Sequence, residues 1–455
     1  MFENIIAQPA TDRLRQDIVS GSFPRSVLFF GPPASGKGSS ALELARVLSC
    51  EGEGPAPWNC PCPACARHRL LLHPDLAVIG PRDFAAEIAA ARRAFLKDTA
   101  SPAGRALFLR SLRKLLLRFS VSVWEYEARS GRANPLPLLE GLEQGLAAFE
   151  AALEKPGADL EKLSAALAGD AFKLEDECVG ESVPIAAIRQ AASWARLSPY
   201  GRRKTLVIEN ADRMKEDARN ALLKLLEEPP PSIHIVLSSV RKESLMQTIL
   251  SRLRPYRFDM RGVEHEREII RRVFRDVGAG AADGEGTESE ERTGGRRDSG
   301  LVAAYLDSFT PEPEEKLLPL AAFFVAAVTR NAVVALRRKG TAELSPALVC
   351  LGGFCARIAE NGGLEKTEQA GPTVAALTEK TAGFRGRSFG RFLSLCLDLV
   401  SRSLAACESG SERIRCMTIW KKRVEEAKVA AGTYNQRPEL ALEALFSSLC
   451  QDLRL

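Results

Sequence analysis

A glycine-rich loop followed by a lysine has the residue types and spacing needed to bind phosphate groups. Gly31 and Gly36 are separated by four residues, and Lys37 follows immediately. Glycines let backbone N–H groups wrap around phosphates, and the N-terminus of a following helix adds positive potential. The lysine would reach the β- and γ-phosphates of a nucleoside triphosphate. This loop therefore predicts a nucleotide-binding site.

The residue after Lys37 counts against magnesium-dependent hydrolysis at this loop. Magnesium binding requires a Ser or Thr hydroxyl at that position, and the sequence has Gly38. Ser39 and Ser40 follow, but each step along a helix rotates the side chain by about 100°, so neither should easily replace the hydroxyl. ATP and Mg²⁺ are therefore possible ligands, and hydrolysis is expected to be weak or absent.

A second polar group lies at the end of an expected strand, residues 205–208. Glu209 could hold the Mg²⁺ shell, as an acid does in hydrolases with such a loop, or it could be an ordinary polar strand end. The next residue would have to activate water, and Asn210 has no basic oxygen that can take a proton. Asp212 lies beyond the strand end. The residues predicted to contact nucleotide are Gly31, Gly36, Lys37, Gly38, Ser39, Glu209 and Asn210.

Four of the eleven cysteines fall close together, at Cys50, Cys60, Cys62 and Cys65. Thiolate sulfur suits Zn²⁺, and four close ligands with no open position give a structural site rather than a catalytic one. His68 or His73 could replace one of the cysteines. A metal-free loop and a redox Cys-x-x-Cys pair are the alternatives to a structural zinc.

Short apolar runs alternate with helical patterns, and these elements must position the candidate residues. Buried strands are expected at residues 26–30, 76–79, 205–208 and 233–237. Helical patterns between strands predict a parallel, doubly wound sheet.

Residues 84–177 are expected to form a helical insertion between two strands. Residues 92–118 carry eight basic residues and one acidic residue, whereas residues 140–177 carry ten acidic and three basic residues. The two arms could pair by charge. Alternatively, one face of the basic arm could contact DNA phosphates or a partner protein, through Arg110, Arg113, Lys114 and Arg118.

The remaining residues are predicted to be helical. Residues 261–312 would form a small helical domain, interrupted at 278–300 by a low-complexity flexible loop. Residues 313–455 would form a separate all-helical domain, and residues 1–260 would contain the sheet with its insertion.

Composition favours a globular protein, with 45% hydrophobic and 27% charged residues. The net charge of +5 is too small to imply nucleic-acid binding by itself. The longest apolar run, residues 317–328, contains Pro319 and is shorter than the roughly 20 residues of a membrane span. The N-terminus lacks the pattern of a signal peptide. We therefore expect a cytoplasmic protein that does not enter a membrane, and no disulfide framework.

The segment 220–230, Asn-Ala-Leu-Leu-Lys-Leu-Leu-Glu-Glu-Pro-Pro, resembles the bacterial clamp-loader AAA+ family. This family includes the gamma/tau and delta-prime subunits of the DNA polymerase III holoenzyme. Other segments that resemble the family are residues 2–8, 73–75, 183–189 and 248–252. The resemblance covers about residues 1–80 and 180–260. It implies an AAA+ P-loop domain with a helical lid and a helical collar domain for oligomerisation.

The resemblance also implies roles for single residues. Arg252 stands where the family carries an arginine finger, which stabilises charge on the nucleotide of the neighbouring subunit. The cysteines stand where the family has a zinc module, although Cys60 lies one residue late. The sensor residues stay open: Ser238 or Ser239 could contact the γ-phosphate, and Arg297 could be the second sensor.

Gly38 and Asn210 depart from the gamma/tau pattern and agree with a delta-prime subunit, which needs no ATPase activity of its own. The implied function is to help load the sliding clamp onto primed DNA during replication, at forks in the nucleoid. The implied partners are gamma/tau, delta, the clamp and primed DNA. The alternatives are a gamma/tau-like motor that hydrolyses ATP, and a zinc-bearing DNA-binding protein outside the loader.

Overall fold

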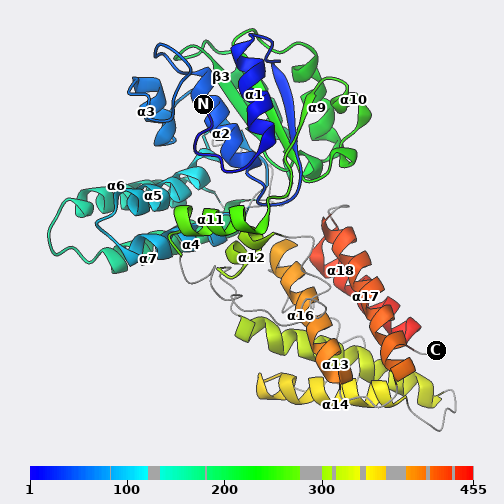
Figure 1. Cartoon of the computed structure of the whole chain (residues 1–455). Coiled ribbons are helices and arrows are strands. Elements are labelled where there is room, and N and C mark those ends of the chain that lie inside the picture. Colours follow the sequence, from blue (N-terminus) through cyan, green and yellow to red (C-terminus); the bar gives the residue numbers. More distant parts are fainter. Residues whose placement is uncertain are drawn as a thin grey trace. The chain divides into compact units, whose positions relative to one another are not determined.

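The computed structural model describes residues 1–81, 83–120, 134–179, 182–276, 300–309, 314–338, 345–364, 386–405, 410–432 and 436–453. The chain divides into two compact units, Met1–Thr310 and Pro311–Leu455 (Figure 1). The predicted domain boundary near residue 260 remains a prediction.

The first unit is built on a five-stranded parallel sheet with the strand order β2-β3-β4-β1-β5. The strands are β1 (Ser26–Phe30), β2 (Leu76–Ile79), β3 (Lys204–Ile208), β4 (Ile233–Ser239) and β5 (Arg254–Arg257). The four predicted strands are confirmed. The edge strand β5 was missed, because only Tyr256 of its four residues is buried and because Pro255 tolerates only an edge position.

Helices cover both faces of this sheet, because successive side chains of a strand point to opposite faces. One face presents Leu28 and Leu206 to α8 (Ile185–Arg196) and α9 (Glu216–Glu227). The other face presents Val27 and Val207 to α1 (Pro9–Val19) and α2 (Lys37–Leu48). The predicted doubly wound sheet is confirmed.

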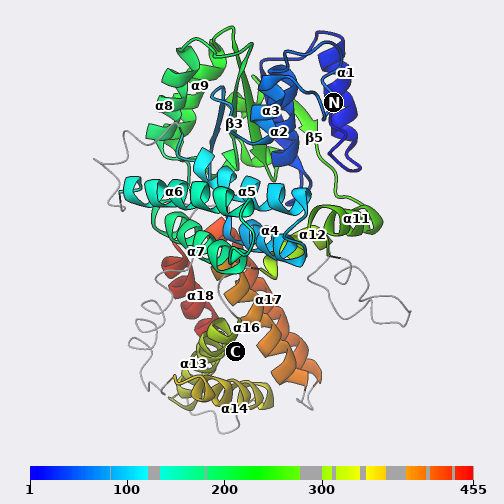
Figure 2. The same ribbon diagram turned by 90° about the vertical axis from the view of Figure 1, so that its left-hand side faces the viewer.

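The predicted insertion consists of helices in its described part, and these share one core (Figure 2). The rings of Phe95, Phe108 and Phe149 lie 5.6 to 5.8 Å apart at its centre. An ion pair between Arg113 and Glu150 joins the basic arm to the acidic arm. The helices are α4 (Ala85–Lys97), α5 (Pro102–Leu117), α6 (Leu136–Leu153) and α7 (Leu160–Cys178).

Shorter elements complete the first unit. They are α3 (Pro63–Arg69), α10 (Gln247–Leu250), α11 (Val263–Val273), α12 (Leu301–Asp307) and the 3₁₀ turns η1 (Ala211–Arg213) and η2 (Lys242–Ser244). Residues 278–299 of the predicted flexible loop, including Arg297, lie outside the described residues.

The second unit is all helical in its described part, as predicted. Its core brings together the aromatic rings of Phe324, Phe392, Trp420 and Phe446. The helices are α13 (Glu314–Arg338), α14 (Pro346–Asn361), α16 (Gly386–Ala405), α17 (Gly410–Gly432) and α18 (Pro438–Asp452).

The apolar segment in α13 is longer than the sequence pattern predicted, so its length does not exclude a membrane span. Pro319 lies inside α13 without ending it, so the apolar segment Leu317–Arg338 has 22 residues and is long and apolar enough to cross a membrane. However, 61% of its most apolar window is buried within the protein. A core helix of a helical bundle passes the same test of length and composition.

Candidate functional site

The glycine-rich loop connects β1 to α2, and both of its predicted glycines are required by its shape. The φ angles are +146° at Gly31 and +95° at Gly36, in the region that favours glycine. A β-carbon at Gly31 would lie 2.0 Å from the backbone oxygen of Phe258. A β-carbon at Gly36 would lie 2.4 Å from the guanidinium of Arg261.

Lys37 is the first residue of α2, and its side chain turns back against the loop. Its Nζ donates to the backbone oxygens of Gly31 at 2.7 Å and Pro32 at 2.6 Å. Burial lowers the pKa of Lys37 to about 8, although the carboxylates of Asp212 and Glu209 oppose this shift. The lysine, the loop and the end of β3 therefore form one site.

Asp212 lies beyond the end of β3 in the sequence, but its carboxylate acts on Lys37 together with that of Glu209. The turn η1 brings Asp212 back toward β4, where its carboxylate accepts a hydrogen bond from Ser239 Oγ at 2.8 Å. Of the two carboxylates, Asp212 acts more strongly on Lys37. A tight 3₁₀ turn after the strand has no periodic residue pattern of its own, so the position of Asp212 could not be predicted directly.

Asn210 is held in a conformation that suits asparagine. Its φ and ψ are 50° and 52°, in the left-handed region that Asn tolerates better than most residues. Its backbone N–H donates to Ser238 Oγ at 3.3 Å, and its side-chain amide donates to the backbone oxygen of Pro81. Neighbouring Glu209 is buried.

The first turn of α2 contains no hydroxyl that replaces the one missing at Gly38. Ser39 is exposed, whereas Ser40 is fully buried, so the two side chains point in different directions. Ser40 Oγ has no hydrogen-bond partner within the described chain.

Arg261 is a residue of this site that the sequence did not indicate. Its Nη1 donates to the backbone oxygen of Ala34 at 3.0 Å, and its Nε donates to that of Ile6 at 2.7 Å. A second cation therefore lies against the phosphate loop beside Lys37.

Arg252 lies after α10 and contacts its own surroundings. Its guanidinium donates to the backbone oxygen of Thr248 at 2.6 Å and to Glu227 Oε1 at 2.8 Å. One third of the side chain is exposed. Within the described ranges, none of its hydrogen bonds or ion pairs reaches the phosphate loop of the same chain. The finger role in a neighbouring subunit stays a prediction.

The four cysteines come together as predicted. Their sulfur atoms all lie within 4.8 Å of one another, and the Sγ atoms of Cys50 and Cys60 are 3.7 Å apart. A tetrahedral Zn²⁺ with Zn–S bonds of about 2.3 Å requires sulfur atoms about 3.8 Å apart, so the spacing fits a metal. Within the group, Cys62 caps the N-terminus of α3 and accepts a hydrogen bond from the Cys65 N–H, which holds these two cysteines together.

The two histidines considered as substitute ligands lie outside this group. His68 and His73 are buried and stack on each other, with ring centroids 4.1 Å apart. Burial lowers the pKa of His68 to about 3. The candidate metal ligands within the described ranges are therefore the four thiolates.

The basic face of α5 is committed to partners inside the chain. Arg110 donates to the backbone oxygens of His68 and Arg69, and burial lowers its pKa to about 10. Arg113 and Lys114 form ion pairs with carboxylates of α6 and α4. These contacts favour pairing within the chain over the alternative of a DNA-binding face.

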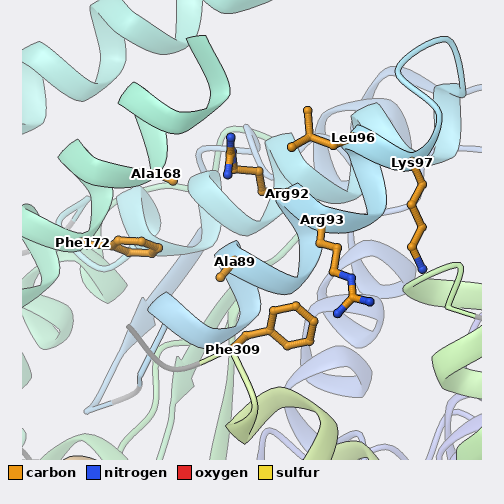
Figure 3. Close-up of a pocket in the computed structure, with 8 residues that line it drawn as sticks. All are labelled: Ala89, Arg92, Arg93, Leu96, Lys97, Ala168, Phe172 and Phe309. Carbon is orange, nitrogen blue, oxygen red and sulfur yellow. The ribbon is translucent and has the colours of Figure 1, made fainter. Parts of the chain in front are cut away.

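A hollow of about 530 Å³ lies elsewhere, between α4, α7 and Phe309 (Figure 3). Five apolar residues and three cations line it, and Arg93 lies over the ring of Phe309 at 5.5 Å. None of the residues predicted to bind nucleotide or metal lines this hollow.

Residues 6–106 and 158–261 match the family model described as DNA polymerase III, delta subunit. These two segments make up just under half of the chain, and over them the chain is similar to the clamp-loader family of DNA polymerase III. The matched residues include the phosphate loop, the cysteine group, the end of β3 and Arg252. They also include α4 and α7, so only residues 107–157 of the predicted insertion fall outside the match.

Two other comparisons accompany this match. None of the curated proteins is similar to the chain. A crystal structure of a DNA polymerase III gamma subunit-related protein from Thermotoga maritima is similar at 17% identity, over 60% of this chain and 81% of that chain. Its TM-score is 0.28.

Proposed function

We propose that this clamp-loader-type subunit is delta-prime-like, and that it helps to load the sliding clamp onto primed DNA without hydrolysing ATP itself. The observation that carries this proposal is a phosphate loop with its lysine in place but without the groups for hydrolysis. Gly38 supplies no hydroxyl for Mg²⁺, and Asn210 replaces the carboxylate that would activate water.

The geometry of the loop supports nucleotide binding more than turnover. Lys37 and Arg261 place two cations at the loop, and cations and backbone N–H groups are what a phosphate chain needs. Ser40 is buried, so it cannot move easily into the position of the missing hydroxyl.

We also propose that Cys50, Cys60, Cys62 and Cys65 hold one structural Zn²⁺. A four-thiolate site leaves no open coordination position, so the metal would stabilise the loop around it. The proposed partners are the gamma/tau and delta subunits, the clamp and primed DNA.

The experiment that tests the proposed role is purification of the tagged chain from its own cells. Recovery of other clamp-loader subunits and DNA polymerase III in stoichiometric amounts is expected. Recovery of the chain on DNA without loader subunits would favour a DNA-binding protein outside the loader.

The isolated chain is expected to hydrolyse ATP at a rate indistinguishable from that of its Lys37→Ala variant. The reason is the absence of a Mg²⁺ hydroxyl and of a carboxylate base. Steady-state phosphate release with Mg²⁺ measures this. Substantial turnover that Lys37→Ala abolishes would favour the gamma/tau-like motor instead.

Nucleotide binding is expected to take up a proton at Lys37 when the pH lies above about 8. Without nucleotide, burial lowers the pKa of Lys37. A bound phosphate would raise that pKa. Binding must then protonate a neutral lysine, so affinity should fall as the pH rises. Calorimetry of ATP binding in buffers of different ionisation enthalpy measures the uptake.

The control for this titration is Lys37→Arg, since arginine stays protonated throughout this range. The variant should show little dependence on buffer. Equal proton uptake by both proteins would contradict the assignment to Lys37.

A further inference from the structure

Arg46 is the most completely engaged buried cation near the cysteine group. It lies on the last turn of α2, and only 1% of it is exposed. All five of its N–H groups donate. The acceptors are Glu43 Oε2 at 2.8 Å, Glu43 Oε1 at 2.6 Å, the Ala56 oxygen at 2.7 Å, the Pro57 oxygen at 3.0 Å and Cys65 Sγ at 3.1 Å.

These contacts join three parts of the chain through one planar group. Glu43, on the same helix, fixes the guanidinium in place. The carbonyls of Ala56 and Pro57 belong to the loop that separates the first two cysteines. The remaining donor points at the sulfur of Cys65 on α3.

Burial of this ion pair is costly, because both charges lose their water. A flexible apolar side chain could fill the same space at no such cost, but it could not donate to the sulfur or to the two carbonyls. Hydrogen bonds from such neighbours orient ligands and tune the metal. The feature that distinguishes arginine here is a charged N–H group aimed at a ligand atom.

We propose that Arg46 is a positioning residue of the metal centre, which holds the Cys65 sulfur and the cysteine loop in the geometry that retains the metal. This inference rests on the proposed metal site. Because α2 begins at the phosphate loop and ends just before Cys50, Arg46 also fixes the metal centre to the helix that carries Lys37.

Arg69 provides a matched control within the same module. Its Nη1 donates to the backbone oxygens of Trp58 and Cys60, both at 2.8 Å. It thus holds the cysteine loop by two carbonyls, as Arg46 does, but within the described residues none of its hydrogen bonds goes to a sulfur atom. Any change in metal binding that comes from losing the hydrogen bond to sulfur should therefore appear in Arg46→Lys and not in Arg69→Lys.

The experiment is titration of metal-depleted full-length chain with Co²⁺ and competition with a chelator, for the wild type and both variants. Arg46→Lys is expected to weaken metal binding by roughly 10- to 100-fold. It should also move the thiolate-to-cobalt charge-transfer band to lower energy, since a sulfur without its hydrogen bond gives up charge more easily. Arg69→Lys should leave the band unchanged.

Each outcome bears on one claim. If the wild type binds no Co²⁺ or Zn²⁺, the metal site itself is wrong. If the wild type binds metal and Arg46→Lys matches Arg69→Lys in affinity and band position, the role of Arg46 is wrong. If Arg46→Lys does not fold, NMR of the cadmium-loaded wild type decides, since absence of coupling between the metal and the Arg46 Nη1 protons would overturn the proposal.

Discussion

Arg252→Ala is expected to slow ATP hydrolysis at one site of the assembled loader by roughly 10³- to 10⁵-fold, the range for sites that depend on an arginine finger. The guanidinium would stabilise charge that develops on the phosphoryl group of the neighbouring subunit's ATP. The ATPase rate of the whole assembled loader should fall by less, because its other sites keep their own arginine fingers.

The structure indicates that this substitution should spare the fold. The ion pair between Arg252 and Glu227 is partly exposed on both sides, and such pairs contribute about 0–1 kcal/mol. Releasing Arg252 from Glu227, so that it can enter a neighbouring site, should cost no more than this. Arg252→Lys should rescue poorly, because a point charge does not replace the planar fork.

The measurement is steady-state ATPase and clamp loading by the reconstituted complex. Arg257→Ala is the matched control, because Arg257 is an exposed arginine of the adjoining strand β5 whose ion pair is with Asp259. The control should behave as the wild type. Equal rates for Arg252→Ala and the control, with assembly confirmed for both, would remove the finger role.

The fold was largely predictable because its central strands are continuous apolar runs buried on both faces. Strands β2 and β3 are buried along their entire length, and such runs are typical of parallel sheets. The edge strand β5 lacks this signal. It is held by pairing with β1, and strand pairing is not visible in a local residue pattern.

The candidate site was predictable only where a local motif carries it. The phosphate loop and the cysteine group each lie within a short segment. Arg261 meets Ala34 and Ile6 from more than 220 residues away in the sequence. Nothing in the local pattern distinguishes this arginine from its exposed neighbours, so only the fold reveals its position.

Asn210 shows how the structure adds a physical reason to a sequence observation. The sequence showed only that a carboxylate is missing. The structure shows a left-handed backbone at this position, which costs most other residues about 1–3 kcal/mol. Asn210→Glu would also lose the side-chain hydrogen bond to Pro81. Restoring the carboxylate alone is therefore not expected to restore hydrolysis.

Removal of the metal is expected to unfold the cysteine module while the sheet stays folded. The buried cluster of this module is small, and three of its five members are cysteines: Val47, Cys50, Ala56, Cys60 and Cys65. Without the metal, this cluster offers little apolar area to offset the entropy of ordering the loop. Structural zinc contributes about 10–16 kcal/mol of binding free energy in zinc-finger peptides, so its loss should dominate the local stability.

The test compares metal content and hydrogen exchange of the wild type, Cys62→Ser and Cys350→Ser. The wild type and Cys350→Ser should retain one Zn²⁺ per chain, because Cys350 lies on α14 in the second unit. Cys62→Ser should lose the metal and exchange rapidly over residues 50–69, with slow exchange kept in β1 and β3. Because Arg46 ties the module to α2, faster exchange should also spread into the last turn of that helix.

Zinc-free wild type purified without chelator, or Cys62→Ser with full metal content, would contradict the metal site. Unchanged exchange in the last turn of α2 on metal loss would instead show that the module and the phosphate-loop helix are not coupled.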